Sequence, residues 1–216
     1  NPAAEPVRSD CLVVGSGIAG LYYALLAARH GSVQVVTKKE SRESNTNYAQ
    51  GGIAAAVSPL DDFDSHVTDT LTAGDGLCRE AVVRDMVAAG PELIEHLLQL
   101  GVAFSRDQEH GGFALGREGG HSQRRVLHCQ DLTGRMIESS LLTACQDTPG
   151  IQLHENHMGL ELLQGRDLGV GGPDAERVVG CLVLDRHTHE QRAFLADTVV
   201  LATGGCGKVY SYTSNP

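Results

Sequence analysis

The 216-residue sequence contains no tryptophan, and aromatic residues make up only 4% of it. A surface on which single-stranded bases stack needs several aromatic side chains, which this composition does not supply. The formal net charge of -10 at pH 7 also opposes contact with a phosphate backbone. The sequence therefore predicts that nucleic acid is not a partner.

Long apolar runs are missing as well. No run approaches the roughly 20 residues that a helix needs to cross a bilayer, and no basic segment followed by an apolar one opens the chain as a signal peptide would. The stretch Asn1–Asp10 is polar and contains prolines, which is typical of a loose arm. We expect a cytoplasmic protein without membrane contact.

Cysteine and histidine patterns typical of metal sites are also absent. None of the six cysteines forms a C-x-x-C pair, and several lie in apolar segments, as Cys11 and Cys181 do. We interpret them as buried or half-buried free thiols in a reducing compartment. The histidines show no ligand spacing, so we expect no metal site. No G-x-S-x-G segment suggests an activated nucleophile.

The sequence does contain a strand, a turn, a helix and a second strand near its start. Cys11–Val14 is a continuous apolar run, typical of a strand buried on both faces, and it ends at Gly15. Leu21–His30 predicts a helix that ends at Gly31. Val33–Thr37 predicts the second strand. This βαβ unit favours an α/β fold with a parallel sheet.

Further elements follow from the apolar spacing. Helices are expected over Ser65–Ala73 with Asp64 or Ser65 as the N-cap, over Arg79–Leu100 split into two by Pro91, and over Thr133–Cys145. Strands are expected over Arg125–Cys129, Ile151–Leu163, Arg177–Asp185 and Ala193–Ala202, with a hairpin tip over 165–176.

The first turn has the sequence Gly15-Ser16-Gly17-Ile18-Ala19-Gly20. A G-x-G-x-x-G pattern has meaning where it links a strand to a helix, as here. Its first glycine allows a tight turn, its second lets a pyrophosphate approach the backbone, and its third lets helix and strand pack closely. The helix N-terminus then offers free N–H groups to phosphates. The motif predicts a dinucleotide site for NAD or FAD.

The end of the second strand departs from the usual dinucleotide pattern. An acidic residue there normally binds the ribose hydroxyls, but Thr37 occupies this place and Glu40 lies beyond it. This weakens the NAD interpretation and leaves ribose recognition to Thr37, Lys38 and backbone groups. Two later glycine segments, Ser44–Gly52 and Val199–Gly205, favour a flavin. An early G-x-G-x-x-G paired with a late A-T-G-G strand end is used by flavoproteins with two dinucleotide folds.

These motifs resemble the L-aspartate oxidase family of the succinate dehydrogenase/fumarate reductase flavoprotein superfamily. The matching segments run in order along the chain, at 15–20, 48–55, 65–78, 117–128, 133–135 and 201–216. The resemblance implies a Rossmann-like FAD-binding fold with a parallel sheet and an added β-meander, formed by residues 1–216 and incomplete at the C-terminus. The capping and C-terminal helical domains, and the family's catalytic arginine, would lie beyond Pro216, so the fragment is expected to be inactive alone.

The resemblance implies FAD bound without a covalent link. Relatives carry FAD on a histidine near the equivalent of Asn45, and asparagine cannot form that bond. The cofactor-binding residues that the resemblance implies are Gly15, Ser16, Gly17, Ile18, Ala19, Gly20, Thr37, Lys38, Asn45, Thr46, Asn47, Tyr48, Ala49, Gln50, Gly51, Gly52, Met158, Gly159, Thr203, Gly204 and Gly205.

The polar loop Arg117–Arg125 is locally basic in an acidic chain. This suits a dicarboxylate, because arginine binds carboxylates through two parallel hydrogen bonds. A carboxylate in the same loop is what an α-ammonium group needs. The resemblance implies Glu118 for that role. Among the histidines of the chain, His121 in this loop is the one that we keep as an active-site candidate.

The implied reaction is oxidation of L-aspartate to iminoaspartate with oxygen or fumarate as the electron acceptor. It would be the first step of de novo NAD biosynthesis through quinolinate, with quinolinate synthase as a candidate partner. Two alternatives stay open, namely a succinate dehydrogenase/fumarate reductase-type flavoprotein and a flavin-binding module without chemistry. Asn45 and Glu118 argue against the first alternative.

Overall fold

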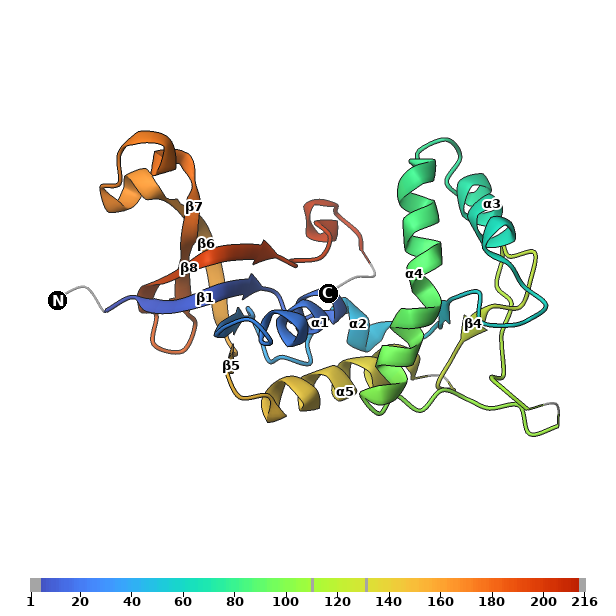
Figure 1. Ribbon diagram of the computed structural model, residues 1–216. Helices are drawn as coiled ribbons and strands as arrows, with labels where there is room; N and C mark the ends of the chain where they lie inside the picture. The colour runs from blue at the N-terminus through green and yellow to red at the C-terminus, as the bar shows by residue number, and fades with distance from the viewer. Residues whose placement is uncertain (1–4, 110, 131, 214–216) are drawn as a thin grey trace. The chain divides into compact units, whose positions relative to one another are not determined.

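The computed structural model describes residues 5–109, 111–130 and 132–213. The chain forms two compact units. The first unit contains residues 1–47 and 141–216, and the second contains residues 48–140. Figure 1 labels most of the helices and strands of both.

A six-stranded sheet forms the first unit (Figure 1). Its strands are β1 (Val7–Val14), β2 (Val33–Val36), β5 (Ile151–His154), β6 (His157–Gln164), β7 (Val178–Asp185) and β8 (Gln191–Leu201), in the order β5-β2-β1-β8-β7-β6. The first four strands in that order are parallel, and β6, β7 and β8 form an antiparallel meander. The expected parallel sheet with an added meander is confirmed.

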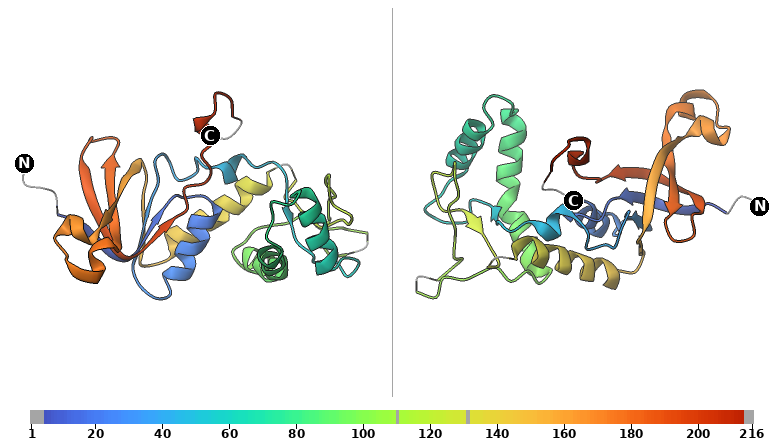
Figure 2. Two further views of the ribbon diagram at one scale, coloured as in Figure 1. Left: turned by 90° about the horizontal axis from the view of Figure 1, so that it is seen from above. Right: turned by 180° about the vertical axis from the view of Figure 1, so that it is seen from behind.

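Strand β1 lies at the centre of the parallel part. It pairs with β8 along most of its length and with β2 only from Cys11 onward. Leu12 and Val13 are fully buried, as a strand between two neighbours requires. Helix α1 (Ile18–Ala27) contacts β1 and β2, and Figure 2 shows it beside the sheet. The helix ends at Ala27, earlier than the expected end at Gly31.

Two expectations about the strands are wrong in detail. The predicted loose arm is partly strand, because β1 begins at Val7 and its first half pairs with β8; residues 1–4 lie outside the described residues. The single strand expected over Ile151–Leu163 is two strands. The chain turns at Asn156, whose φ of 57° is left-handed, so that β5 joins β2 and β6 joins β7.

The histidines on either side of this turn pack at the end of the sheet. The His154 ring hydrogen-bonds with Gln34 Oε1 and lies edge-on to Phe194. Burial, with the nearby charges of His157 and Arg192, lowers the pKa of His154 to about 4.

Short 3₁₀ helices follow β6 and β8 in this unit. The predicted hairpin tip between β6 and β7 consists of two 3₁₀ helices, η1 (Gly165–Leu168) and η2 (Gly172–Glu176). A third, η3 (Gly207–Val209), follows β8.

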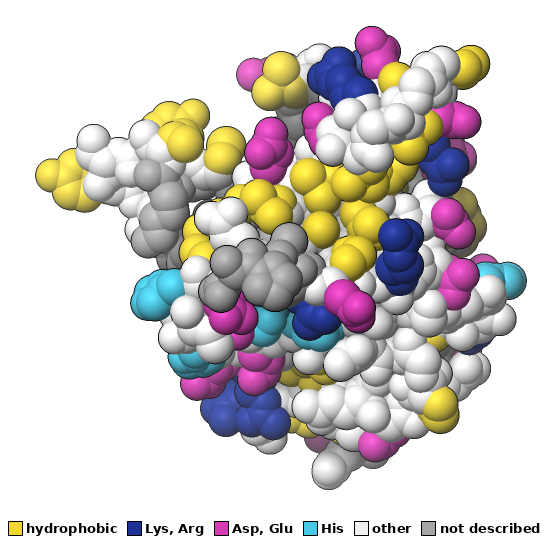
Figure 3. Space-filling view, turned by 90° about the vertical axis from the view of Figure 1, so that its left-hand side faces the viewer, with side chains coloured by type: hydrophobic (Ala, Val, Ile, Leu, Met, Phe, Trp, Pro, Cys, Tyr) yellow, Lys and Arg dark blue, Asp and Glu magenta, His cyan; other side chains and the backbone are white. Residues whose placement is uncertain are grey.

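Hydrophobic side chains gather on the side of the molecule seen in Figure 3. The exposed hydrophobic residues of β6 and of the segment after it include Leu160, Leu162 and Leu168.

Helices are the longest elements of the second unit, and long irregular segments connect them. Its elements are β3 (Ile53–Ala54), β4 (Val126–Leu127), α3 (Phe63–Ala73), α4 (Glu80–Gln99) and the start of α5 (Thr133–Asp147), while α2 (Asn45–Tyr48) begins in the first unit. β3 and β4 pair antiparallel. The N-cap of α3 is Asp62, which accepts a hydrogen bond from Ser65 N, and not Asp64 or Ser65 as expected.

Helix α4 continues through Pro91, and the expected division into two helices is wrong. Proline removes one hydrogen bond of the helix. The buried residues Val83, Val87, Ile94 and Leu97 nevertheless keep helical spacing on one face across the proline. Packing of that face therefore outweighs the local preference for a break.

Four of the six cysteines are buried and Cys78 is half-buried, but Cys206 is exposed, against expectation. It follows the glycines after β8, where the chain has left the sheet. Among the described residues, no helix is both long enough and apolar enough to span a membrane.

Candidate functional site

The Gly15–Gly20 turn lies where β1 ends between its two parallel neighbours. Gly15 N donates to Val36 O of β2, and Ala202 N, just after β8, donates to Val14 O. The chain runs from β1 to β2 on one side, while β8 lies on the other side. Ligands of open α/β sheets bind at such a switch point, beyond the carboxyl ends of the strands.

The three glycines of this turn differ in their surroundings. Gly15 has φ +117°, and a Cβ atom there would overlap the Ala202 carbonyl. A Cβ atom at Gly20 would overlap the Gly15 carbonyl oxygen. At Gly17 the nearest atom to an added Cβ would be Thr46 Oγ1, at 3.7 Å. Gly15 and Gly20 thus serve packing, whereas the open space beside Gly17 fits the approach of a pyrophosphate.

The N-terminus of α1 is open to an anion. Its N-cap residue is Gly17, which has no side chain with which to cap the helix. Ile18 N donates to Thr46 Oγ1 at 3.1 Å. Ala19 is exposed at the first turn of the helix. The partial positive charge of the helix end is thus available to a phosphate group.

Ser16 and Thr37 hold the turn against the end of β2. The Ser16 hydroxyl lies 2.9 Å from Thr37 Oγ1 and 3.0 Å from the Ser41 carbonyl oxygen, and all three residues are buried. Thr37 Oγ1 is therefore hydrogen-bonded within the protein, and Lys38 is exposed beside it. The role of both residues in ribose binding stays a prediction.

Other predicted cofactor residues gather at the same edge of the first unit. The Asn45 side-chain nitrogen would lie 3.8 Å from a Cβ atom at Gly204, so the start of α2 meets the loop after β8. Thr203, Gly204 and Gly205 are exposed there. Gly159 in β6 lies against Val14 and Cys181, since an added Cβ would be 3.3 Å from Val14 Cγ1, and Met158 precedes it.

The Tyr48–Gly52 segment belongs to the second unit. Gly134 N, at the start of α5, donates to Ala49 O at 3.1 Å. Gly52 lies against the backbone of Leu127, where a Cβ atom would overlap the carbonyl oxygen. An added Cβ atom at Gly51 would lie 3.4 Å from Glu118 Oε1. The structure thus brings a predicted flavin-binding segment beside the predicted substrate carboxylate.

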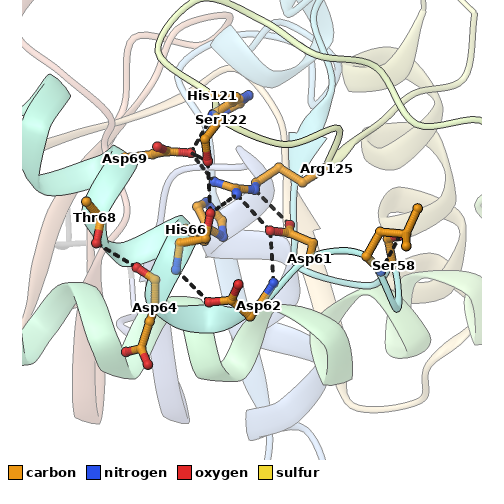
Figure 4. Close-up of polar contacts among 12 residues, drawn as sticks. Ser58, Asp61, Asp62, Asp64, His66, Thr68, Asp69, His121, Ser122 and Arg125 are labelled. Carbon is orange, nitrogen blue, oxygen red and sulfur yellow. Dashed lines mark hydrogen bonds and ion pairs between the residues drawn. The ribbon is translucent and has the colours of Figure 1, made fainter.

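A buried arginine anchors the loop that carries Glu118. Arg125 is fully buried, and its Nε and Nη2 atoms donate to the two carboxylate oxygens of Asp61, each at 2.8 Å. Its Nη1 atom donates to Asp69 Oδ2 at 2.6 Å. Figure 4 shows both carboxylates converging on the guanidinium group. Arg125 is therefore a structural cation, and the basic side chains exposed in the loop are Arg117 and Arg124.

His121 lies beside a second histidine. Its ring is edge-on to that of His66, with the ring centroids 6.3 Å apart. Burial, with the charges of Arg125 and His121, lowers the pKa of His66 and favours the neutral ring. The Nδ1 atoms of both histidines are buried without a hydrogen-bond partner among the described residues. Each ring can therefore form a further hydrogen bond through its Nδ1 atom.

Sequence reasoning missed the cluster of Asp61, Ser65, His66, Asp69 and Arg125. One signal was present, because Arg125 opens a predicted strand whose next residues are Val and Leu. A buried arginine requires carboxylates. The sequence does not show which of the 27 acidic residues supply them.

The second unit also contains a cavity of about 590 Å³ with both polar and apolar lining residues. Two acidic residues, one arginine and one histidine are among its lining residues, and neither Glu118 nor His121 is. The lining residues are Ser58, Leu60, Asp61, Asp107, Phe113, Ala114, Leu115, Gly116, Gln123, Arg124 and His128.

Known proteins resemble the chain along nearly its whole length. L-aspartate oxidase 2-a, chloroplastic, from Nicotiana tabacum is 44% identical over 210 residues, which are 96% of this chain and 31% of that protein. L-aspartate oxidase from Pseudomonas aeruginosa is 44% identical over 219 residues, or 99% of this chain and 40% of that protein. The chain thus spans well under half the length of these relatives.

Solved structures agree with the fold. A quinol-fumarate reductase with menaquinol molecules has a TM-score of 0.88 and 30% identity, and the match covers 98% of this chain and 36% of that one. A mutant of the E. coli quinol fumarate reductase has a TM-score of 0.86 and 30% identity over 97% of this chain and 34% of that one. The family model described as FAD binding domain matches residues 10–216. Its cofactor is FAD, which the space beside Gly17 and the open N-terminus of α1 fit, and the chain belongs to this FAD binding domain family.

Proposed function

We propose that the chain is the FAD-binding part of an enzyme that oxidises L-aspartate to iminoaspartate, with oxygen or fumarate as the electron acceptor. In this proposal the reaction opens de novo NAD biosynthesis through quinolinate, and quinolinate synthase consumes the product. We further propose a cytoplasmic location and FAD held without a covalent bond.

The position of Glu118 carries this proposal. Its carboxylate lies beside the backbone of Gly51, in the Tyr48–Gly52 segment that is predicted to bind the flavin. A carboxylate at this place attracts the α-ammonium group of an amino acid. Succinate has no such group and gains nothing from it. The identity of 44% to two L-aspartate oxidases supports the same substrate.

The residues of the chain orient the substrate and tune the charge around it. Glu118 accepts hydrogen bonds from the ammonium group, and exposed Arg117 and Arg124 offer positive charge to the carboxylates. Oxidation removes a hydride from Cα and a proton from nitrogen. When bound, FAD supplies the acceptor for that hydride. His121, with a free buried Nδ1 atom, is suited to hydrogen-bond the substrate or a water molecule near it.

A succinate or fumarate enzyme is the second candidate, favoured by the TM-scores of 0.88 and 0.86 to fumarate reductases. The two candidates differ in the use of Glu118. In the full-length protein, aspartate and succinate oxidation are measured for the wild type, for Glu118→Gln and for the control Glu109→Gln, which changes another exposed carboxylate of the second unit. We expect Glu118→Gln to lower kcat/KM for aspartate at least ~10-fold, because the ammonium loses a charged partner.

The control should match the wild type. Wild-type oxidation of succinate in preference to aspartate would refute the proposal.

For the cofactor, acid precipitation of the purified protein should release the flavin into the supernatant. Yellow colour retained in the pellet would show a covalent bond and overturn the role inferred from Asn45.

A further inference from the structure

The loop that carries Glu118 and His121 has little structure of its own to fix its position. Residues 117–124 contain no helix or strand, and Glu118 and Ser122 are exposed. Hydrogen bonds within the loop are local, as in His121 N to Glu118 O at 3.2 Å and Arg117 Nε to His121 O at 2.8 Å. Such contacts shape the loop but do not attach it to the rest of the unit.

One carboxylate oxygen attaches this loop to α3. Asp69 Oδ2 accepts hydrogen bonds from Ser122 N at 2.7 Å, from Ser122 Oγ at 2.8 Å and from Arg125 Nη1 at 2.6 Å. Two of these three donors belong to the residue that follows His121. Ser65, one helical turn before Asp69, adds a contact of 2.8 Å between its Oγ atom and Ser122 Oγ.

The carboxylate is itself held firmly. Burial alone would raise the pKa of Asp69, but the hydrogen bonds from Ser122 and the charge of Arg125 outweigh burial and hold the pKa below its usual value. Arg125 is fixed in turn by its two bonds to Asp61. The loop is therefore tied to a charged group that cannot rotate freely (Figure 4).

A purely structural ion pair would not need Ser122. Arg125 and Asp61 already satisfy each other inside the unit, with side chains 0% and 1% exposed. Asp69, whose side chain is 14% exposed, directs Oδ2 to both the buried guanidinium and the exposed loop. Asp69 therefore links the loop to the buried pair of Arg125 and Asp61, and the fixed position of that pair fixes the position of the loop.

We propose that Asp69 is the positioning residue that holds Glu118 and His121 in place for the amino-acid substrate. The inference rests on the proposed function of the loop in aspartate recognition. Asp69 reaches the substrate only through Ser122 and the loop backbone. Its loss should therefore weaken substrate binding more than it slows the chemical step.

The test compares three variants of the full-length protein. Asp69→Asn keeps the side-chain shape but lacks the charge, and Ser122→Ala removes the two hydroxyl contacts of the loop, with Asp69 and Ser65, without touching the buried ion pair. Asp64→Asn is the matched control, because Asp64 is an 82% exposed carboxylate on the same helix and also pairs with an arginine, Arg84. Two quantities are measured for each: the rate of trypsin cleavage after Arg117 and Arg124, and the kinetics with L-aspartate.

We expect Asp69→Asn to speed cleavage in the loop ~10-fold and to raise KM for aspartate ~5- to 10-fold while kcat changes less than ~3-fold, as for loss of one charge-assisted bond. Ser122→Ala should shift both quantities in the same direction by less. Asp64→Asn should leave both unchanged. Flavin content and the melting temperature show whether each variant is folded.

Unchanged loop cleavage in both Asp69→Asn and Ser122→Ala would overturn the inference, because the loop would be held without Asp69. Faster cleavage with an unchanged KM would also overturn it, because loop order would then not serve the substrate. Failure of the proposed function has a different result. There the wild type does not oxidise aspartate at all, and loop cleavage still decides whether Asp69 attaches the loop.

Discussion

The addition of one methyl group is expected to have different effects at Gly15 and at Gly17. At Gly15 the methyl group would overlap the Ala202 carbonyl, and φ is +117°. At Gly17 it would enter open space, 3.7 Å from Thr46 Oγ1, and the φ and ψ angles of -72° and 177° suit alanine. Gly15→Ala should thus damage the fold, and Gly17→Ala should damage cofactor binding.

The surroundings of the two glycines determine how much each substitution should change the free energy of unfolding and the affinity for FAD. Overpacking costs about 1–3 kcal/mol, and an unfavourable backbone angle costs about 1–3 kcal/mol more. Gly15→Ala should therefore lower the free energy of unfolding by roughly 2–6 kcal/mol, out of about 5–15 kcal/mol for a typical domain. Gly17→Ala loses only a better N-cap residue, about 0.5–1 kcal/mol. Its methyl group would stand where the pyrophosphate approaches, so FAD affinity should fall at least ~10-fold, or about 1.4 kcal/mol.

Two measurements separate the effects. Urea unfolding of the apoprotein followed by circular dichroism gives stability, and quenching of flavin fluorescence on titration gives affinity. Gly171→Ala is the control, because Gly171 is also an N-cap residue and an added Cβ there meets nothing within 4 Å. Equal loss of stability in Gly15→Ala and Gly17→Ala, with unchanged FAD affinity in the latter, would refute the separate roles of the glycines.

Three further predictions concern stability. Arg125→Met should destabilise the protein by about 3–5 kcal/mol in urea unfolding, because Asp61 stays buried without its partner, while exposed Arg124→Met should have little effect. His154→Gln should reduce the loss of stability as pH falls from 6.5 to about 4, measured by unfolding at each pH, because the unfolded histidine binds a proton there and the folded one does not. Pro91→Ala should raise the free energy of unfolding by about 2 kcal/mol, since a helix interior favours alanine by about 3 kcal/mol and the unfolded chain returns about 1.

Each of these predictions has a clear contrary result. Equal effects of Arg125→Met and Arg124→Met would mean that the buried pair contributes no more than a surface charge. An unchanged pH dependence in His154→Gln would show that the ring is protonated equally well in the folded state. A Pro91→Ala protein that unfolds more easily would show that the helix depends on the rigid proline ring at this position.

The sheet and the cofactor turn were predictable because their signals are local. Apolar runs such as Cys11–Val14 and Val33–Thr37 report strands, and the glycine spacing between them reports the turn. Errors arose where contacts distant in sequence decide. The sequence around Pro91 predicts a break in the helix, because the buried face on both sides of the proline is not visible in the sequence. Asn156 turns the chain within a segment whose sequence predicts one strand. The four residues Val7–Asp10 read as an arm because their order comes from pairing with β8.

The substrate loop could be located but its support could not. Glu118 and His121 stand in a polar, glycine-rich segment that resemblance to a family could assign. Their anchor is Asp69, which lies 53 residues before Ser122 in the chain. No period or spacing connects the two, because a hydrogen bond across that separation leaves no repeating pattern in the sequence.

The two kinds of site therefore tolerate substitution differently. The Gly15–Gly20 turn presents backbone groups to its ligand. Its function therefore depends on glycines that have no side chain, and a single added methyl group disturbs it. The loop presents side chains, so its function depends on the anchor below it. Substitutions at exposed loop positions that are not proposed to contact the substrate, such as Gln123, should be tolerated while Asp69, Arg125 and Ser122 stay together. A change in any one of these three should alter the position of Glu118, although Asp69 and Arg125 lie outside the loop's exposed surface.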